Sequence, residues 1–453
     1  MSKLSELASY IAELELSCIP DVVQKSGILH ILDSIGTGLG AVYDQQIQSV
    51  LKEWLKIGGE NGEGYISVWG TNKKASLSTA VFLNAMMSHT LEMDDVHTNS
   101  KTHIGTVVVP AAWGMAEYLG RTGDDVLLAV ICGYEVMSRI GMAFGVTSHR
   151  NKGWHVTATA GTFGAAAAAG KLLGLNKKQM TWALGLAGAQ SFGTWAFLGD
   201  GTSAKVLNPA RAAQVGMESA LLVKAGMTGA EHILTADDGG LFSMMSDEAD
   251  VQLVTEGLGQ EWQLMMMDNK TYPSCRSTHC AIDGTLELCQ TYEISEKNIE
   301  HIEVETYFVG YKQCGSSKGS LNPETPVNAR FSTPFTVACA VMYGEVSLRQ
   351  LKQDIIMDPE IRKLMHKVTV KPTLEFSDAY PHHWGCRVII RTNDGSVYVS
   401  YMKDASGSVD KPLTQTQVKD KAVSLMMETC PDKANKLAEQ ILSIRKLDIL
   451  PQL

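Results

Sequence analysis

Carboxyl and imidazole side chains crowd into residues 88–105, SHTLEMDDVHTNSKTHIG. Glu92, Asp94, Asp95 and His97 lie close together there, and His103 follows near the end of the stretch. Histidine changes charge near neutral pH and therefore suits proton transfer, while a neighbouring carboxylate can orient the ring. A solvated junction at a helix end has the same composition, so this stretch by itself leaves both interpretations open.

Three more segments place a polar group among small or apolar residues. GWHVTATAG carries His155 ahead of an alanine-rich run, and GDGTSAKVLNPARAA carries Lys205 in a glycine-rich loop. A helix cap or a buried, hydrogen-bonded histidine would also explain His155, and an exposed loop lysine would explain Lys205. The third segment, DNKTYPSCRSTHCAIDG, brings Lys270 and Arg276 together around one proline and is the hardest to explain as a plain surface loop.

The elements that position these residues are helices throughout the first half of the chain. TAVFLNAMMSHTLEMDD is predicted to be a helix on which His89 and Glu92 share a face. The helix after His103 is predicted to become regular near Val109, since Pro110 follows. A position just before a helix N-terminus gives His103 a partly positive surrounding that favours anions.

The periodicity changes after about residue 265. HIEVETYFVGY alternates in steps of two and predicts a strand that extends toward Tyr311. CRVIIRT and SVYVSY flank Asn393-Asp394-Gly395, a turn signal in which both central positions tolerate positive φ. Helical character returns at TQTQVKDKAVSLMMETC. The sequence therefore predicts a mostly α protein, with a large all-helical domain from residues 1–265 and 405–453 and an inserted α+β lid domain at 266–404.

Composition agrees with two soluble domains. The chain has 453 residues, of which 45% are hydrophobic and 19% charged, and its formal net charge is −10. That charge argues against nucleic acid as a partner. The apolar run at 126–146 contains Glu135 and Arg139, which argues against a membrane span. Nine scattered cysteines without a CxxC pair and an N-terminus without a signal peptide indicate a cytoplasmic protein.

Four of these segments together form an ordered and spaced set of motifs: HTLEMDDVHTNSKTHIG, GWHVTATAGTFGAAAAAGKLLGL, TSAKVLNPARAAQVG and KTYPSCRSTH. This combination resembles the MmgE/PrpD family over nearly the whole chain. The resemblance implies a helical domain with an inserted lid, a homodimer, and an active site between the domains that uses neither metal nor organic cofactor. Carried over by motif, it implies catalytic roles for His103, Glu92 and His155, and substrate-binding roles for Lys205, Lys270 and Tyr311. We expect Arg276 to add a further cation for substrate binding.

Family activities include 2-methylcitrate dehydratase, cis-aconitate decarboxylase and iminodisuccinate epimerase, and all act on a small polycarboxylate. We expect a cofactor-independent lyase in which His103 transfers the proton, Glu92 orients His103, and the lysines stabilise the charge that develops beside a carboxylate. The acidic motif with Glu92 looks more like the epimerase-type branch, so an isomerase is the alternative on the same scaffold.

Three other interpretations are weighed against this one. A helical dimer could bind metabolites without catalysis, but binding alone does not require two imidazoles and a carboxylate beside the cations. Asp94, Asp95, His97 and His103 could ligate a divalent cation, although the lysines would repel it. Cys275 lies beside Arg276 and could act as a nucleophile, but a structural cysteine at a helix start explains it as well.

Overall fold

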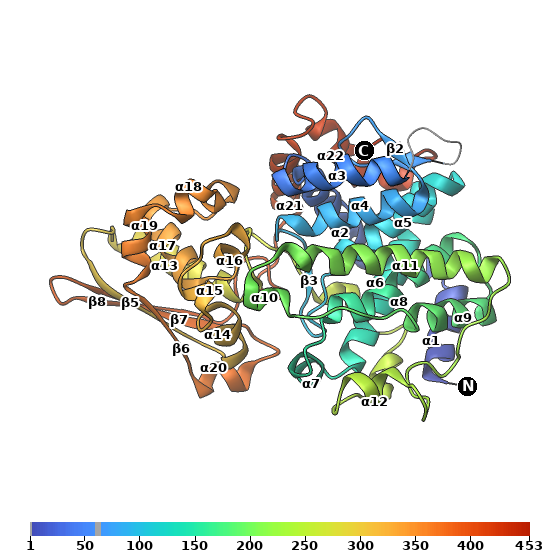
Figure 1. Ribbon diagram of the computed structural model, residues 1–453, viewed down its shortest axis with the longest axis horizontal. Helices are drawn as coiled ribbons and strands as arrows, with labels where there is room; N and C mark the ends of the chain where they lie inside the picture. Colours follow the sequence, from blue (N-terminus) through green and yellow to red (C-terminus); the bar gives the residue numbers. More distant parts are fainter. Residues whose placement is uncertain (1, 59–64) are drawn as a thin grey trace.

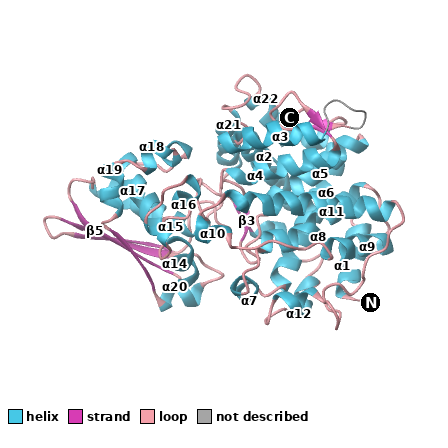
Figure 2. Ribbon diagram, in the orientation of Figure 1, coloured by secondary structure: helices cyan, strands magenta, loops and turns pink. Residues whose placement is uncertain are grey.

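The computed structural model describes residues 2–58 and 65–453. Figure 1 shows a larger helical body, which contains the N-terminus, beside a smaller region drawn in yellow and orange that carries the sheet. Each has its own hydrophobic core, one made by residues 4–267 and 422–453, the other by residues 280–405. We call these parts the helical body and the α+β region. The mostly α class with a smaller α+β part is as predicted (Figure 2).

The helical body is built almost entirely from α-helices, with two short antiparallel strand pairs. Its helices are α1 (Lys3–Glu13), α2 (Asp21–Gly40), α3 (Gln45–Gly58), α4 (Leu77–Thr90), α5 (Gly105–Leu119), α6 (Gly123–Ala143), α7 (Val146–Asn151), α8 (Val156–Leu172), α9 (Lys177–Gly188), α10 (Phe197–Asp200), α11 (Leu207–Lys224), α12 (Leu241–Met245), α21 (Gln415–Met426) and α22 (Ala434–Leu442). Its strands are β1 (Ile66–Ser67), β2 (Lys74–Ala75), β3 (Val96–His97) and β4 (Met267–Asp268).

Two helix starts carry local capping motifs of the sequence, Thr122-x-x-Asp125 and Asn176-x-x-Gln179. Thr122 and Asp125 form the reciprocal capping box that opens α6, and Asn176 caps α9 with Gln179 as its partner. The helix α5 begins at Gly105, four residues before the predicted start, and accommodates Pro110 within its second turn. The helix α6 is long and apolar enough to cross a membrane, but 89% of its apolar window is buried inside the protein.

The α+β region lays helices on a four-stranded sheet. Its helices are α13 (His279–Tyr292), α14 (Phe308–Cys314), α15 (Lys318–Leu321), α16 (Pro326–Arg330), α17 (Thr333–Tyr343), α18 (Gln353–Ile356), α19 (Pro359–Met365) and α20 (Leu374–Ala379). Its strands are β5 (Ile299–Thr306), β6 (Val368–Pro372), β7 (Cys386–Thr392) and β8 (Val397–Met402), in the order β6-β5-β7-β8. The strand β6 is parallel to β5, whereas β7 is antiparallel to both β5 and β8.

Two details of this region differ from the sequence prediction. The strand β5 ends at Thr306, and the chain turns into α14, so Tyr311 lies on a helix and not on the strand. The hairpin between β7 and β8 is present, but only Gly395 has positive φ, at +84°, and the Gly395 amide donates to the Thr392 carbonyl. The loop therefore has three residues, with glycine at the left-handed position.

The chain passes between the two parts at two neighbouring points. On the way out, β4 pairs with β3, and Arg276 donates its Nε to Asp268 at 3.0 Å. On the way back, the Ser406 carbonyl accepts from Nη1 of the same arginine at 2.9 Å. The chain then packs α21 and α22 into the core of the helical body. The junction therefore lies beside the histidine-rich segment that follows α4.

Candidate active site

The acidic segment after α4 is folded tightly by its own side chains. The helix α4 ends at Thr90, and Glu92 then adopts a left-handed backbone with φ of 55°. Asp95 accepts hydrogen bonds from the Gly105 amide at 2.9 Å and from the Tyr134 hydroxyl at 2.7 Å. Asp95 thus fixes the start of α5, and with it the position of His103. The predicted helical continuation through Glu92 is wrong because the left-handed turn at this residue breaks the helix.

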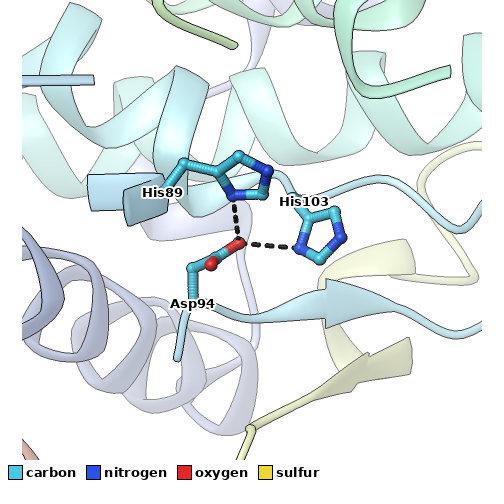
Figure 3. Close-up of side chains that lie close together, drawn as sticks. All are labelled: His89, Asp94 and His103. Carbon is cyan, nitrogen blue, oxygen red and sulfur yellow. Dashed lines mark hydrogen bonds and ion pairs between the residues drawn. The ribbon is translucent and has the colours of Figure 1, made fainter. Parts of the chain in front are cut away.

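One carboxylate oxygen joins two histidines at the centre of the site. Figure 3 shows Asp94 between His89 and His103, with Oδ2 at 3.0 Å from Nδ1 of His89 and 2.7 Å from Nδ1 of His103. Nδ1 of His103 also lies 3.1 Å from the Asp95 carbonyl oxygen. The sequence analysis predicted that Glu92 orients His103. In the structure Asp94 contacts His103 instead, because Glu92 turns toward the lysines.

These contacts decide where the proton of His103 lies. Both partners of Nδ1 are acceptors, so Nδ1 carries the hydrogen in the neutral ring, and Nε2 presents a lone pair pointing away from Asp94 (Figure 3). Burial lowers the pKa of His103 to about 4, although the Asp94 carboxylate opposes the shift. Burial would raise the pKa of Asp94, but His89, Lys270 and His103 hold it well below its usual value. The site thus presents a neutral base at pH 7.

Glu92 forms a buried ion cluster with the two predicted lysines. Its carboxylate contacts Nζ of Lys205, and its second oxygen lies 3.1 Å from Nζ of Lys270. Burial alone would raise the pKa of Glu92, but the two ammonium groups outweigh burial and hold it well below the normal range. Against the effect of burial, the carboxylates of Glu92 and Asp94 raise the pKa of Lys270. Burial lowers the pKa of Lys205, although Glu92 opposes the shift. Both lysines also line the pocket described below, where their ammonium groups meet an anionic ligand.

His155 stands immediately before α8 and carries the opposite tautomer. The side-chain amide nitrogen of Asn208 lies 3.0 Å from Nδ1 of His155 and also 3.3 Å from the Thr194 carbonyl oxygen, to which it can only donate. Nδ1 of His155 therefore accepts, and its Nε2 carries the hydrogen. Burial and the nearby charge of Lys205 lower the pKa of His155 well below normal, so this ring is a neutral donor.

These groups surround one small cavity of about 50 Å³ at the junction of the two parts. It is lined by Glu92, Val96, Lys101, His103, His155, Trp195, Lys205, Lys270, Cys275, Arg276, Gln313, Phe331, Tyr380 and Trp384. We call it the catalytic pocket, after the role proposed for it below. A larger cavity of about 720 Å³ lies on the other side of Glu92, Lys205 and Phe331, which line both spaces. Six of the seven predicted site residues thus share one pocket.

The seventh, Tyr311, does not line this pocket; its helix α14 contributes Gln313 instead. Arg276 does line the pocket, but it is largely engaged elsewhere, with Asp268, Nδ1 of His279 at 3.0 Å and the Ser406 carbonyl. Arg276 therefore acts first as a link across the junction. Cys275 also lines the pocket, and a hydrogen bond with Cys314 lowers its pKa to about 7.

The alternative metal-ligand set of Asp94, Asp95, His97 and His103 is not brought together in the structure. Asp95 is used at the start of α5, and His97 bonds through Nδ1 to the Ser100 hydroxyl at 2.8 Å. Among the described residues, His89, Asp94 and His103 instead place ligand atoms within 4.8 Å of one another. Hydrogen bonds explain those contacts fully, and the neighbouring ammonium group of Lys270 disfavours a divalent cation.

Several residues in and beside the pocket were not predicted from sequence as part of the catalytic site. Asp94 was considered only as a metal ligand, although its position between two histidines in one motif could have indicated an orienting role. Lys101 has a left-handed backbone with φ of 60° and places its ammonium group 4.1 Å from the Trp384 ring centre. The aromatic residues Trp195 and Tyr380 carry no local sequence signal for a binding site, because only the packing of distant segments brings them here.

Comparison with known proteins agrees with this architecture. The MmgE/PrpD N-terminal domain matches residues 5–254, and the MmgE/PrpD C-terminal domain matches residues 272–445. A cis-aconitate decarboxylase-like protein of Aspergillus oryzae is 28% identical over 436 residues, covering 92% of this chain and 89% of that protein. The cis-aconitate decarboxylase of Aspergillus terreus is 28% identical over 410 residues (86% and 83%), and that of Homo sapiens 26% over 433 residues (91% and 85%). The two domain matches together span nearly the full sequence, and the chain therefore belongs to the MmgE/PrpD family.

Proposed function

We propose that this protein is a cofactor-independent lyase that moves a proton next to a carboxylate of a small polycarboxylate. One arrangement carries the proposal: His103, held by Asp94 at 2.7 Å, shares a pocket with Lys205 and Lys270. The cis-aconitate decarboxylase relatives support the same class of reaction. A dehydratase of the 2-methylcitrate type and a decarboxylase of the cis-aconitate type both fit it.

The proposed reaction depends on stabilising the negative charge that develops beside a substrate carboxylate. When a proton leaves a carbon beside a carboxylate, its electron pair delocalises into that carboxylate, which then carries additional negative charge. Lys205 and Lys270 offer fixed positive charge in a site of low dielectric, where it stabilises such a species far better than water does. Nε2 of His103 accepts the proton, and Asp94 stabilises the imidazolium that forms.

The two lyase reactions differ in the second step. In a dehydration the electron pair expels hydroxide from the adjacent carbon, and the proton held by His103 leaves with it as water while the His155 Nε2–H hydrogen-bonds the departing oxygen. In a decarboxylation the bond to carbon dioxide breaks first, and its electron pair stays on the substrate carbon. His103 supplies the proton to that electron pair, and it must first take this proton up from solvent because its resting ring is neutral.

An isomerase of the iminodisuccinate type is the second candidate. The observation that favours it is the pair of imidazoles in one pocket with opposite tautomers, His103 as acceptor and His155 as donor. Inverting a carbon needs one group to remove the proton and another to return it from the opposite face.

Proton NMR in deuterated water separates these reactions. Purified protein is incubated in turn with cis-aconitate, 2-methylcitrate and chiral iminodisuccinate. Loss of a carboxylate indicates the decarboxylase and loss of water the dehydratase, whereas deuterium incorporation with inversion and no net elimination indicates the isomerase. Silence with all three substrates, at protein concentrations where binding is measurable, would instead support a protein that binds metabolites without catalysis.

The first prediction concerns His103→Ala. Because the proton acceptor is removed, we expect kcat to fall at least about 100-fold, with little change in the Kd of a substrate analogue such as citrate, which the lysines bind. His301→Asn is the matched control, since His301 contacts Thr369 in the sheet of the α+β region and does not line the pocket. Near-normal turnover by His103→Ala would overturn the assignment of this residue.

A further inference from the structure

A third cavity, of about 260 Å³, also adjoins the catalytic pocket. Four residues line both spaces and so form a common wall: Lys101, Trp195, Gln313 and Tyr380. The rest of this cavity comes from residues 146–156, around α7, and from the start of α14. We call it the Arg150 cavity, after the side chain that dominates its charge.

The Arg150 cavity has cationic groups and no carboxylate among its lining residues. Arg150 and Lys312 contribute positive charge, whereas burial lowers the pKa of Lys101 well below its usual value. Within the described part of the chain, the Arg150 side chain makes no hydrogen bond or ion pair, and its Nε is buried. A guanidinium group remains protonated and loses free energy when its donors are desolvated without partners. The cavity is therefore prepared for an anion.

Trp195 links this cation to the catalytic residues. The guanidinium of Arg150 lies 4.3 Å from the Trp195 ring centre, and the same ring meets the imidazole of His155 edge-on at 4.9 Å. Nε1 of Trp195 is buried without a hydrogen-bond partner among the described residues. One indole thus separates the unpaired cation from the proposed proton-transfer site, and it offers a second unused donor.

The remaining walls are mostly apolar. Trp154, Trp195, Phe308 and Tyr380 supply aromatic surface, and Val146, Val156 and Val309 supply aliphatic surface. Water-exposed methylene groups or a ring would gain free energy by packing there, at roughly 25 cal/mol per Å² buried. The combination of apolar walls and an unpaired guanidinium group fits a ligand arm that is apolar along its length and anionic at its end.

We propose that the Arg150 cavity is a substrate subsite: it takes an alkyl or aryl arm that extends from the reacting polycarboxylate head and ends in a carboxylate bound by Arg150. This inference rests on the proposed function, because the head must occupy the catalytic pocket. With this subsite the preferred substrate is longer than a simple tricarboxylate. Arg150 and Trp195 then determine which arm length and which terminal charge the protein accepts.

Binding of a chain-length series tests the proposal without any turnover. Calorimetric titration measures Kd for succinate, adipate and suberate, and for octanoate as the apolar acid without a second carboxylate. The protein is the full chain with His103→Ala, so that no reaction interferes. We expect suberate to bind about tenfold or more tightly than succinate, since a charge-assisted contact is gained, and octanoate to lack this gain.

Arg150→Gln is the decisive variant, and Lys152→Gln is its matched control. Lys152 lies two residues away, pairs with Asp247 at 2.6 Å and does not line the Arg150 cavity. Arg150→Gln should raise the Kd of suberate about tenfold or more and leave that of succinate unchanged, while Lys152→Gln alters neither.

Three results would contradict the subsite. They are equal affinity for succinate and suberate, equal affinity for octanoate and suberate, and an equal loss for every ligand in Arg150→Gln. None of these depends on whether the wild-type protein converts cis-aconitate or 2-methylcitrate. A chain-length effect that vanishes with Arg150 would support the subsite even if the NMR assay assigned a different reaction.

Discussion

At the scale of single residues, Asp94 is the group on which proton transfer depends. It binds two imidazoles through one oxygen, which fixes the His103 ring and keeps hydrogen on its Nδ1. Glu92, two residues earlier, has a different task, because it neutralises part of the charge on Lys205 and Lys270. Two carboxylates of one short motif are thus separated into an orienting group and a counter-ion by the left-handed backbone at Glu92.

Asp94→Asn tests the orienting role. We expect kcat to fall about 100- to 10,000-fold, because an amide holds the ring less well and does not stabilise an imidazolium. The carboxylate raises the His103 pKa against burial, so its loss should lower that pKa further. Activity that needs neutral His103 rises as pH increases through about 4 in the wild type, and this acid limb should move to lower pH in the variant.

The pH profile of kcat/KM measures this shift. Asp124→Asn is the control, since Asp124 forms an exposed ion pair with Arg445. An Asp94→Asn enzyme with normal kcat and an unmoved acid limb would show that Asp94 is not the orienting partner.

At the scale of elements, the alanine-rich helix α8 sets the spacing of the site. His155 precedes α8, and Lys205 lies in the short turn Ser203–Val206 that leads into α11. The two helices approach closely because small residues face each other. A Cβ at Gly216 would lie 2.3 Å from the Thr162 carbonyl oxygen and 2.7 Å from the Cβ of Ala165. The small residues at the contact between α8 and α11 therefore determine how far His155 lies from Lys205.

Gly216→Ala tests that packing. The added methyl group cannot fit without separating α8 from α11, so we expect a loss of about 1–3 kcal/mol in the free energy of unfolding. Gly199→Ala is the matched control: Gly199 is also helical, and a Cβ there meets no atom within 4 Å. Chemical denaturation measures both variants. Equal unfolding midpoints for the two would contradict the close approach inferred for these helices.

At the scale of the whole molecule, the pocket exists only because the α+β region is joined to the helical body at one place. The body contributes His103, His155 and Lys205, while Gln313 and Tyr380 come from the other part. The return of the chain into the body through α21 closes this arrangement. The pocket and the segments around it consequently bury several imidazoles whose pKa values are lowered, which makes the stability of the fold depend on pH.

The pH dependence of stability is the corresponding prediction. Burial lowers the pKa of His97 to about 3 and of His103 and His149 to about 4, whereas an unfolded histidine titrates near 6.5. Between these values the unfolded chain binds protons that the folded chain does not. Stability is therefore complete above pH 6.5 and decreases as the pH falls toward 4, by roughly a few kcal/mol for each group.

Urea unfolding between pH 7.5 and pH 5 measures this loss. The slope of the free energy of unfolding against pH gives the number of protons taken up on unfolding, and His97→Asn should reduce that number by about one. His366→Asn serves as the control, because His366 is exposed at the end of α19. A free energy of unfolding that stays constant across this range would contradict the burial of neutral imidazoles.

The sequence by itself determined the helical class, the capped helix starts at Thr122 and Asn176, the change of periodicity near residue 265 and the motifs that contain the site residues. These features depend on contacts within a few positions along the chain, which local composition specifies. Only the tertiary structure decided which groups meet. Glu92 binds Lys205 and Lys270 across 113 and 178 residues of chain, so Asp94 was left to orient His103.

The same reason explains the other differences from the sequence prediction. Arg276 is occupied at the junction, Tyr311 lies on a helix outside the pocket, and Trp195 with Tyr380 forms the wall toward the Arg150 cavity. Each depends on how one packed core is set against another. Side chains distant in sequence become neighbours only when that packing is complete, because burial and close approach, and not local propensity, fix their partners.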